Sequence, residues 1–147
     1  MKILLVPTDF SATSERILQT ATTLAQALGA RVVVLHVLQP ITPIGDPTMM
    51  PDMTQLAAMQ KTAEESARAQ LARACAQVAA QGVAVEQELR DGPAAPVILD
   101  RARDLPADLV VMGSHGHTAL HDLLLGGTSH AVLKKSPCPV VIVPAKK

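Results

Sequence analysis

Short aliphatic runs alternate with longer segments of helical periodicity along this chain, and this alternation constrains the fold more than any other feature. The expected strands are residues 2–6, 31–38, 83–89, 107–112 and 140–143. The expected helices run from Asp9 or Ser11 to Leu28, and then over 53–81, 94–103 and 128–135. Strands and helices that alternate in this way are joined by right-handed crossovers in a parallel sheet. The sequence therefore predicts one doubly wound α/β domain over residues 1–147, with a five-stranded parallel sheet.

The composition excludes several classes of protein. The 147 residues are 48% hydrophobic, which is incompatible with a disordered chain. Thirteen basic and thirteen acidic residues cancel, and Phe10 is the only aromatic residue, so no nucleic-acid partner is expected. No apolar run approaches the ~20 residues that span a bilayer, so no membrane partner is expected either. Pro7 ends the first apolar run below the roughly 7–15 residues of a secretory signal core, which favours a cytoplasmic protein.

The segment 39–52 interrupts the regular alternation. It contains four prolines and the pair Met49-Met50. Too few residues precede it for an independent core, so it is expected to be a loop or a partner-facing segment rather than a domain boundary. The helix that follows, 53–81, has no internal Gly or Pro and should extend over roughly 40 Å.

A glycine pattern near the C-terminus is the one feature that suggests binding chemistry. The fourth expected strand leads into Gly113-Ser114-His115-Gly116, and after nine residues comes Gly126-Gly127-Thr128-Ser129. Glycines at the carboxyl end of a strand leave backbone N–H groups free to face an anion, and a helix N-terminus adds partial positive charge. The pattern fits a phosphate cradle. It also fits two ordinary turns in which Thr128 or Ser129 is the helix N-cap.

Together with this glycine pattern, three stretches of the chain resemble the universal stress protein family over nearly the whole length. They are residues 6–14, 129–133 and 136–140. The resemblance implies a Rossmann-like sheet of strand order 3-2-1-4-5 and a homodimer. One branch of the family binds ATP through Gly, two residues, Gly, nine residues, Gly and then Ser or Thr, whereas another branch lacks this motif and does not bind ATP. The glycine spacing here is similar to that of the ATP-binding branch.

The resemblance also implies a site for ATP, ADP or AMP, with Mg²⁺ held by the nucleotide. The residues expected to form it are Pro7, Thr8, Asp9, Val37, Met112, Gly113, His115, Gly116, Gly126, Gly127, Thr128 and Ser129. Asp9 has a second interpretation as a helix N-cap, and His36 is expected on the sheet surface rather than at the ligand. Gly127 stands where the family motif has Ser or Thr, so a hydroxyl must come from Thr128, from Ser129 or from nowhere.

No catalytic residue and no protein-held metal are expected. His115, His117 and His121 have only Asp122 as a nearby acidic residue, which is a poor ligand set. Cys75 and Cys138 follow no metal-ligand or redox spacing. The sequence contains neither a Gly-x-Ser-x-Gly nucleophile elbow nor a P-loop.

Three functions remain open from the sequence. The first is a stress-response protein that binds ATP and acts as a nucleotide-dependent regulator or interaction module for unidentified protein clients. The second is a nucleotide-free homodimeric interaction protein of the same fold, with 39–53 as its contact surface. The third is a slow ATP hydrolase. In the implied strand order, 138–144 is an apolar edge, and pairing it with a second copy would satisfy its free backbone groups, which predicts a homodimer there.

Overall fold

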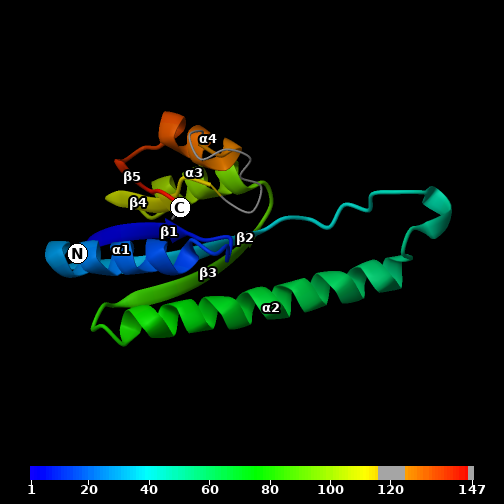
Figure 1. Cartoon of the computed structure of the whole chain (residues 1–147), viewed down its shortest axis with the longest axis horizontal. Helices are drawn as coiled ribbons and strands as arrows, with labels where there is room; N and C mark the ends of the chain where they lie inside the picture. The colour runs from blue at the N-terminus through cyan, green and yellow to red at the C-terminus, as the bar shows by residue number, and fades with distance from the viewer. Residues whose placement is uncertain (116–124, 146–147) are drawn as a thin grey trace.

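The computed structural model describes residues 1–115 and 125–145, and it contains the predicted parallel sheet (Figure 1). The strand order is β3-β2-β1-β4-β5, which confirms the order that the resemblance implies. The strands are β1 Lys2–Pro7, β2 Ala30–Leu38, β3 Val85–Asp91, β4 Leu109–Gly113 and β5 Val140–Val143. The helices are α1 Ser14–Leu28, α2 Met53–Ala79, α3 Ala94–Asp104 and α4 Gly127–Lys135, with a short 3-10 helix η1 at Pro47–Met49.

Helices cover both faces of the sheet, as a doubly wound fold requires. Leu4 and Val6 of β1 belong to the core that α1 and α2 cover, whereas Leu5 belongs to the core under α3 and α4. Successive side chains of a strand point to opposite faces, so a strand covered on both sides must be apolar throughout. This explains why β1 and most of β2 are continuous aliphatic runs.

The boundaries of β3 differ from the sequence prediction. The strand begins at Val85 rather than Val83 and continues past Leu89 to Asp91. Its register with β2 carries the pairing as far as Leu38 opposite Asp91. Apolar alternation located this strand, but its ends depend on the neighbouring strand, because the ladder of backbone hydrogen bonds sets them.

The start of α1 also differs from the prediction. The helix begins at Ser14 with Thr13 as its N-cap residue, so neither Asp9 nor Ser11 caps it. Asp9 Oδ1 instead accepts a hydrogen bond of 3.0 Å from the Ser11 N–H, and the Ser11 carbonyl accepts one from the Ser14 N–H. Short-range bonds of this kind give backbone groups an alternative to the helix. They keep Asp9 in the loop that follows β1.

Helix α2 is longer than the sheet face that it covers. Its 27 residues extend over about 40 Å. Its buried residues all lie in its C-terminal half: Ala67, Leu71, Ala74 and Val78. The N-terminal half projects from the body of the molecule together with the preceding loop (Figure 1). We call this projection, residues 39–66, the arm.

The described residues also show the state of the two cysteines and whether any helix could span a membrane. Cys75 and Cys138 are free, partly buried thiols. Among the helices that the structure describes, none combines the length and the apolarity that a membrane span needs.

Candidate functional site

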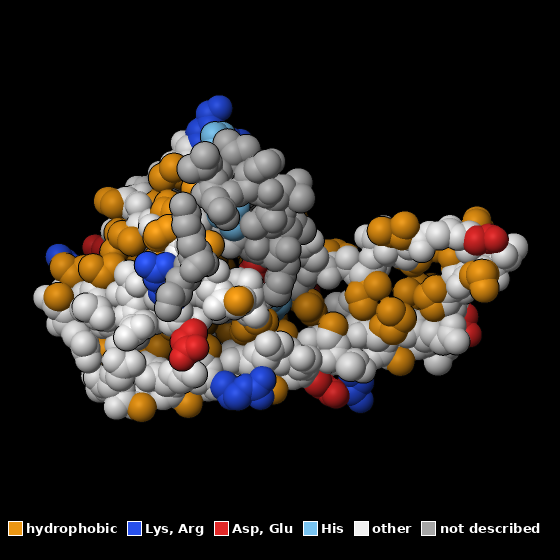
Figure 2. Space-filling model, viewed as in Figure 1, with side chains coloured by type: hydrophobic (Ala, Val, Ile, Leu, Met, Phe, Trp, Pro, Cys, Tyr) orange, Lys and Arg blue, Asp and Glu red, His pale blue; other side chains and the backbone are white. Residues whose placement is uncertain are grey.

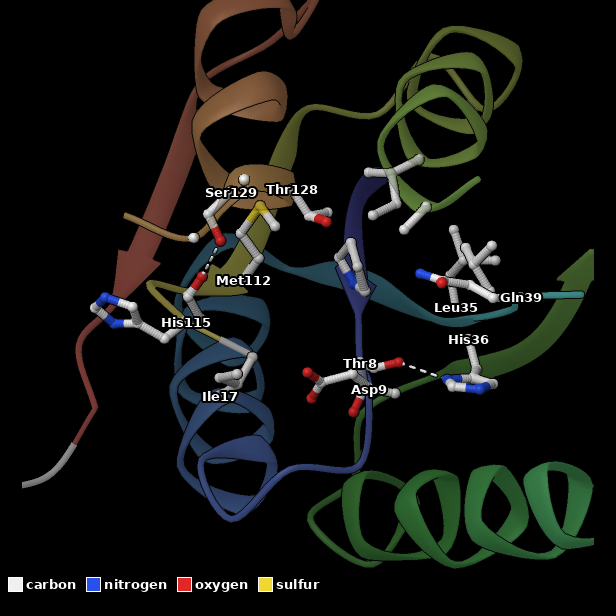
Figure 3. Close-up of a pocket in the computed structure, with 17 residues that line it drawn as sticks. Thr8, Asp9, Ile17, Leu35, His36, Gln39, Met112, His115, Thr128 and Ser129 are labelled. Atoms are coloured by element: carbon white, nitrogen blue, oxygen red, sulfur yellow. Dashed lines mark hydrogen bonds between the residues drawn. The ribbon is translucent and has the colours of Figure 1, made fainter. Parts of the chain in front are cut away.

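The candidate site is a cavity of about 430 Å³ at the carboxyl ends of β1, β2 and β4 (Figure 3). In open α/β sheets this end, where the strand order reverses, is where ligands bind. Its volume lies within the range of about 300–1,000 Å³ that is typical of small-molecule sites. The lining residues are Pro7, Thr8, Asp9, Ile17, Leu35, His36, Val37, Gln39, Ala94, Ile98, Met112, Gly113, His115, Gly126, Gly127, Thr128 and Ser129.

The fold brings together every predicted site residue that the structure describes. Residues from the end of β1, from Val37 in β2 and from Gly113 at the end of β4 meet the first turn of α4 around one cavity. Gly116, which was also predicted for the site, lies outside the described residues, as do His117 and His121. The residues predicted from the glycine pattern and the family resemblance are thus neighbours in space, although Pro7 and Ser129 are 122 positions apart.

The loop after β1 is held in place by hydrogen bonds of Thr8. The Thr8 N–H donates to the Leu35 carbonyl at 2.8 Å, which ties the loop to β2. The Thr8 hydroxyl donates to Ser14 Oγ at 3.0 Å and accepts from the Phe10 N–H at 3.2 Å. Phe10 adopts a φ of 59°, a left-handed conformation that is uncommon for a residue other than glycine. These contacts fix the turn that presents Asp9 at the cavity.

His36 lies at the cavity wall, although sequence reasoning placed it on the sheet surface away from a ligand. Its Nδ1 is 2.7 Å from the Thr8 carbonyl oxygen, so Nδ1 carries the proton and donates (Figure 3). Its ring stacks on Phe10 with centroids 4.4 Å apart. Both contacts are made with the loop after β1. The sequence could have placed His36 at the site from its position beside Val37, near the carboxyl end of β2, because this fold binds ligands at that end of the sheet.

The first turn of α4 is positioned by bonds to the end of β4. Ser129 Oγ donates to the Gly113 carbonyl at 2.7 Å, and the Gly126 N–H donates to the Ser114 carbonyl at 2.8 Å. Gly126 is the N-cap residue, with an extended conformation at φ −62° and ψ 159°. The alternative interpretation, in which Thr128 or Ser129 is the N-cap, is therefore wrong, because both lie inside the helix and the Ser129 hydroxyl bonds to β4.

The N-terminus of α4 opens into the cavity. The first N–H groups of a helix have no acceptor within the helix and carry partial positive charge. Here they belong to Gly127, Thr128 and Ser129, which all line the cavity. Among the described lining residues there is one carboxylate, Asp9, and no Lys or Arg. An anionic group at this end would therefore be held by backbone N–H groups and the helix dipole rather than by a cationic side chain.

The two glycines Gly113 and Gly127 differ in the space around them. A Cβ on Gly113 would lie 3.0 Å from Ile17 Cδ1 and 3.3 Å from the His115 carbonyl, so the close packing of α1 against β4 favours glycine there. A Cβ on Gly127 would meet no atom of the described residues within 4 Å. Gly113 therefore has a packing role of its own, whereas none of the described neighbours of Gly127 requires glycine there.

Ser114 and His115 form a hydrogen-bonded pair beside the cavity, with Ser114 Oγ 2.9 Å from His115 Nδ1. Figure 3 shows the His115 ring directed toward β5, away from Thr8 and His36. Ser114 is buried, and its hydroxyl accepts a hydrogen bond from the Ala145 N–H at 3.3 Å. The pair thus joins the end of β4 to the chain after β5. Within 1–115 and 125–145, no group of three or more His, Cys, Asp or Glu side chains is arranged to hold a metal ion.

Other lining residues were not among those predicted. Ile17 comes from α1, and Leu35 comes from β2. Gln39 directly follows β2, and Ala94 and Ile98 come from the first turns of α3. All of them except Gln39 add apolar surface to the cavity wall. Their apolar periodicity indicated only burial, because a residue that faces a cavity and one that faces a neighbouring side chain have the same sequence pattern.

Comparison with known proteins agrees with the fold. The family model described as "Universal stress protein family" matches residues 1–144. A relative from Thermus aquaticus, named "Universal stress protein in QAH/OAS sulfhydrylase 3'region", is 36% identical over 144 residues, which cover 97% of this chain and 98% of the relative. This chain belongs to the universal stress protein family.

Solved structures have the same fold. The structure of MJ0577 matches with a TM-score of 0.86 and 28% identity, over 99% of this chain and 97% of the other; MJ0577 is a universal stress protein of Methanocaldococcus jannaschii. A universal stress protein in complex with cAMP matches with a TM-score of 0.70 and 24% identity, over 97% and 96%. One from Archaeoglobus fulgidus in complex with dAMP has a TM-score of 0.68 and 22% identity, over the same shares.

Proposed function

We propose that this protein binds an adenine nucleotide in the cavity at the ends of β1, β2 and β4, and that the bound nucleotide regulates its interactions with protein clients. The observation that carries the proposal is the meeting of the α4 N-terminus and Gly113 with Asp9 and Val37 around one cavity of about 430 Å³. Two universal stress proteins of this fold were solved with adenine nucleotides, cAMP and dAMP, which agrees with this ligand class.

The two ends of the cavity suit the two ends of a nucleotide. Pro7, Leu35 and Val37 give an apolar wall for a base, and the Val37 backbone would hydrogen-bond its edge. Asp9 would accept hydrogen bonds from a ribose hydroxyl or from the adenine amine. The N–H groups at the start of α4 would receive the phosphates, since anions are stabilised at helix N-termini. A Mg²⁺ ion would be held mainly by the phosphates, because Mg²⁺ retains most of its water and needs few protein ligands.

Thr128 is the residue that would supply the hydroxyl missing at Gly127. Ser129 is 4% exposed, and its Oγ already donates a hydrogen bond to the Gly113 carbonyl. This hydroxyl therefore positions the helix. Thr128 lies in the first turn of α4 and its side chain faces the cavity (Figure 3). Thr128 would thereby make the phosphate contact that the family motif assigns to the residue at position 127.

Assembly through β5 is part of the same proposal. β5 is at one edge of the sheet, and Val140, Val141 and Ile142 are only half-buried in the single chain. An edge strand of this kind has free backbone groups on its outer side. A two-fold pairing of residues 138–144 with a second copy would cover these groups and the half-buried side chains.

Calorimetric titration with ATP, ADP and AMP tests the binding proposal, together with mass spectrometry of any ligand released from the purified protein. Gly126→Val should abolish binding, because its branched side chain would occupy space beside the phosphates. The extended conformation of Gly126 accepts valine, so the fold should remain intact. Unchanged ATP affinity in a folded Gly126→Val protein would reject the site.

A matched pair of threonine variants sharpens this test. Thr128 and Thr54 are both the second residue of a helix, α4 and α2, and Thr54 is exposed on the arm. We expect Thr128→Val to weaken ATP binding by about tenfold or more, the value of one hydrogen bond to a charged group, and Thr54→Val to leave it unchanged. Equal affinities in the two variants would exclude the hydroxyl contact but not the backbone cradle.

A further inference from the structure

A second cavity, of about 330 Å³, lies in the arm, away from the proposed nucleotide site. It is enclosed by the chain that leaves β2 and by the first turns of α2, and it reaches the paired ends of β2 and β3, where Leu38 is opposite Asp91. Apart from Gln60 and Asp91 its lining is apolar: Leu38, Pro40, Ile41, Met53, Leu56 and Ala57. We call this cavity and its rim the arm groove.

The apolar face of the arm groove continues the core-facing stripe of α2. In the body of the molecule this stripe is buried against the sheet at Ala67, Leu71, Ala74 and Val78. The same helical spacing continues toward the N-terminus through Ala63, Gln60, Leu56 and Met53. In the arm the stripe extends past the ends of β2 and β3, and the chain that leaves β2 lies opposite it (Figure 1). The N-terminal half of α2 therefore continues the spacing of the buried half, but none of its stripe residues is fully buried.

Hydrophobic side chains gather on the arm at the surface as well (Figure 2). Met53 is 82% exposed, Met49 85% and Ile44 96%. Exposed apolar residues in a contiguous patch, unlike scattered ones, mark an interaction surface. Methionine side chains are flexible and polarizable, so a surface that contains several of them adapts to different apolar partners.

The charge on the arm selects the kind of partner. The arm, residues 39–66, contains four acidic residues, Asp46, Asp52, Glu64 and Glu65, against one basic residue, Lys61, and Asp91 adds a carboxylate at the groove itself. Two hydrogen bonds from Thr48, one from its N–H and one from its hydroxyl, lower the pKa of Asp46, so this carboxylate is ionised at neutral pH. Arg90, next to Asp91, has Glu88 as an ion-pair partner at 3.6 Å. Two copies of the arm would bring like charges together, whereas a basic partner would complement them.

We propose that the arm groove docks an amphipathic helix of a partner protein, with apolar anchors at positions i, i+3, i+4 and i+7 and with Lys or Arg on its flanks. The anchors fill the space between α2 and residues 38–41, and the basic flanks face the acidic rim. This is the helix-in-groove mode of recognition, in which the apolar face gives affinity and the flanking charge gives selectivity. The proposal is independent of nucleotide binding, because the two cavities share no lining residue.

The test uses the full chain and three fluorescent peptides of about 18 residues, long enough to form a helix. The probe has Leu on one helical face and Lys on the other. The first control replaces each Lys by Glu, and the second has the Leu and Lys order scrambled. Fluorescence anisotropy should show binding of the Lys peptide alone, weakening as ionic strength is raised from about 0.01 M to about 1 M, where charges are screened within a few ångströms. Equal binding of the Lys and Glu peptides, or no binding of the Lys peptide, would overturn the proposal.

Two methionine variants locate the binding site. Met53 lines the arm groove, whereas Met59 is on the same helix, is 48% exposed and does not line it. Met53→Gln should weaken the Lys peptide by about tenfold or more, and Met59→Gln should have little effect. Asp91→Asn should weaken it about threefold at low salt and not at high salt. Equal effects of the two methionine variants would place binding elsewhere, and a wild-type dimer that Met53→Gln dissociates in sedimentation would assign the groove to a second copy instead.

Discussion

The cavity at the sheet and the arm groove each have a volume of a few hundred cubic ångströms, yet different hydrogen bonds stabilise their walls. Around the cavity, Thr8 and Ser129 form hydrogen bonds that join residues far apart in the chain. In the described bonds of the arm, the side chains of Asp46 and Asp52 bond only to residues two or three positions away. A site made where strand ends converge is ordered by the whole fold, whereas the arm depends on local turns and one helix. We therefore expect the two regions to respond differently to the same kind of substitution.

The largest effect is expected from a charge placed in the edge strand. Val141→Asp puts a carboxylate in the middle of β5 and should convert the proposed homodimer to monomer or to insoluble protein, which sedimentation equilibrium would measure. Ile44→Asp, a charge at a 96% exposed position of the arm, is the matched control and should leave the dimer intact. The opposite result would show that the arm, and not β5, holds two copies together.

The two halves of α2 offer a direct comparison with one substitution. Leu71 is 1% exposed beneath the sheet, and Leu71→Ala should lower the free energy of unfolding by about 2–5 kcal/mol through lost burial and the cavity left behind. Leu56→Ala in the arm should cost less than about 1 kcal/mol, because its surroundings are open on one side. Urea denaturation measures both values. Equal losses would mean that the arm is packed as firmly as the body.

The next effect concerns the nucleotide cavity alone. Gly127→Ser restores the hydroxyl of the family motif at a position where a Cβ meets no atom of the described residues within 4 Å. The free energy of ATP binding should become more favourable by at most about 1.5–3 kcal/mol, the value of a hydrogen bond to a charged group. Calorimetry would detect this change. A weaker affinity would mean that Gly127 is required for its own backbone conformation near the ligand.

The smallest effect compares two ion pairs, one in the body and one in the arm. Arg101 donates two hydrogen bonds to Glu88, and these bonds lower the pKa of Glu88 below its ordinary value of 4.5. Because the pKa is lowered in the folded state, the stabilisation is complete above about pH 4.5 and is lost as pH falls through the folded-state pKa. Glu88→Gln should cost about 1–2 kcal/mol at pH 7 and remove this part of the acid sensitivity.

The control for that prediction is Glu64→Gln. Glu64 pairs with Arg68 one turn away on an exposed face of α2, and such pairs contribute about 0.3–0.5 kcal/mol. Urea titrations at a series of pH values from 7 downward should therefore separate the two variants at pH 7, and the difference should shrink as the pH falls through the lowered folded-state pKa of Glu88. A loss for Glu64→Gln as large as that for Glu88→Gln would contradict the view that tertiary contacts order the body and local ones the arm.

Several features of the fold followed from local sequence. Continuous aliphatic runs predicted the central strands β1 and β2, because strands covered on both faces cannot carry polar residues. The break at Gly29, in the left-handed conformation with φ 62°, predicted the end of α1. Periodicity and helix propensity predicted α2 to within two residues at its C-terminal end. The strand order and the set of site residues came from the family resemblance, and the structure places the described ones around one cavity.

What the sequence determined by itself was thus the identity of each element, since apolar spacing and turn residues act within a few positions. The tertiary structure decided which groups meet. Asp9 is a loop residue and not a helix cap because Ser11 competes for its carboxylate, and His36 reaches the cavity wall because the Thr8 carbonyl and Phe10 hold its ring. It also decided that the stripe of α2 would run beyond the sheet. The stripe has one pattern along its length, but burial depends on what lies opposite, and that is determined only when the chain has folded.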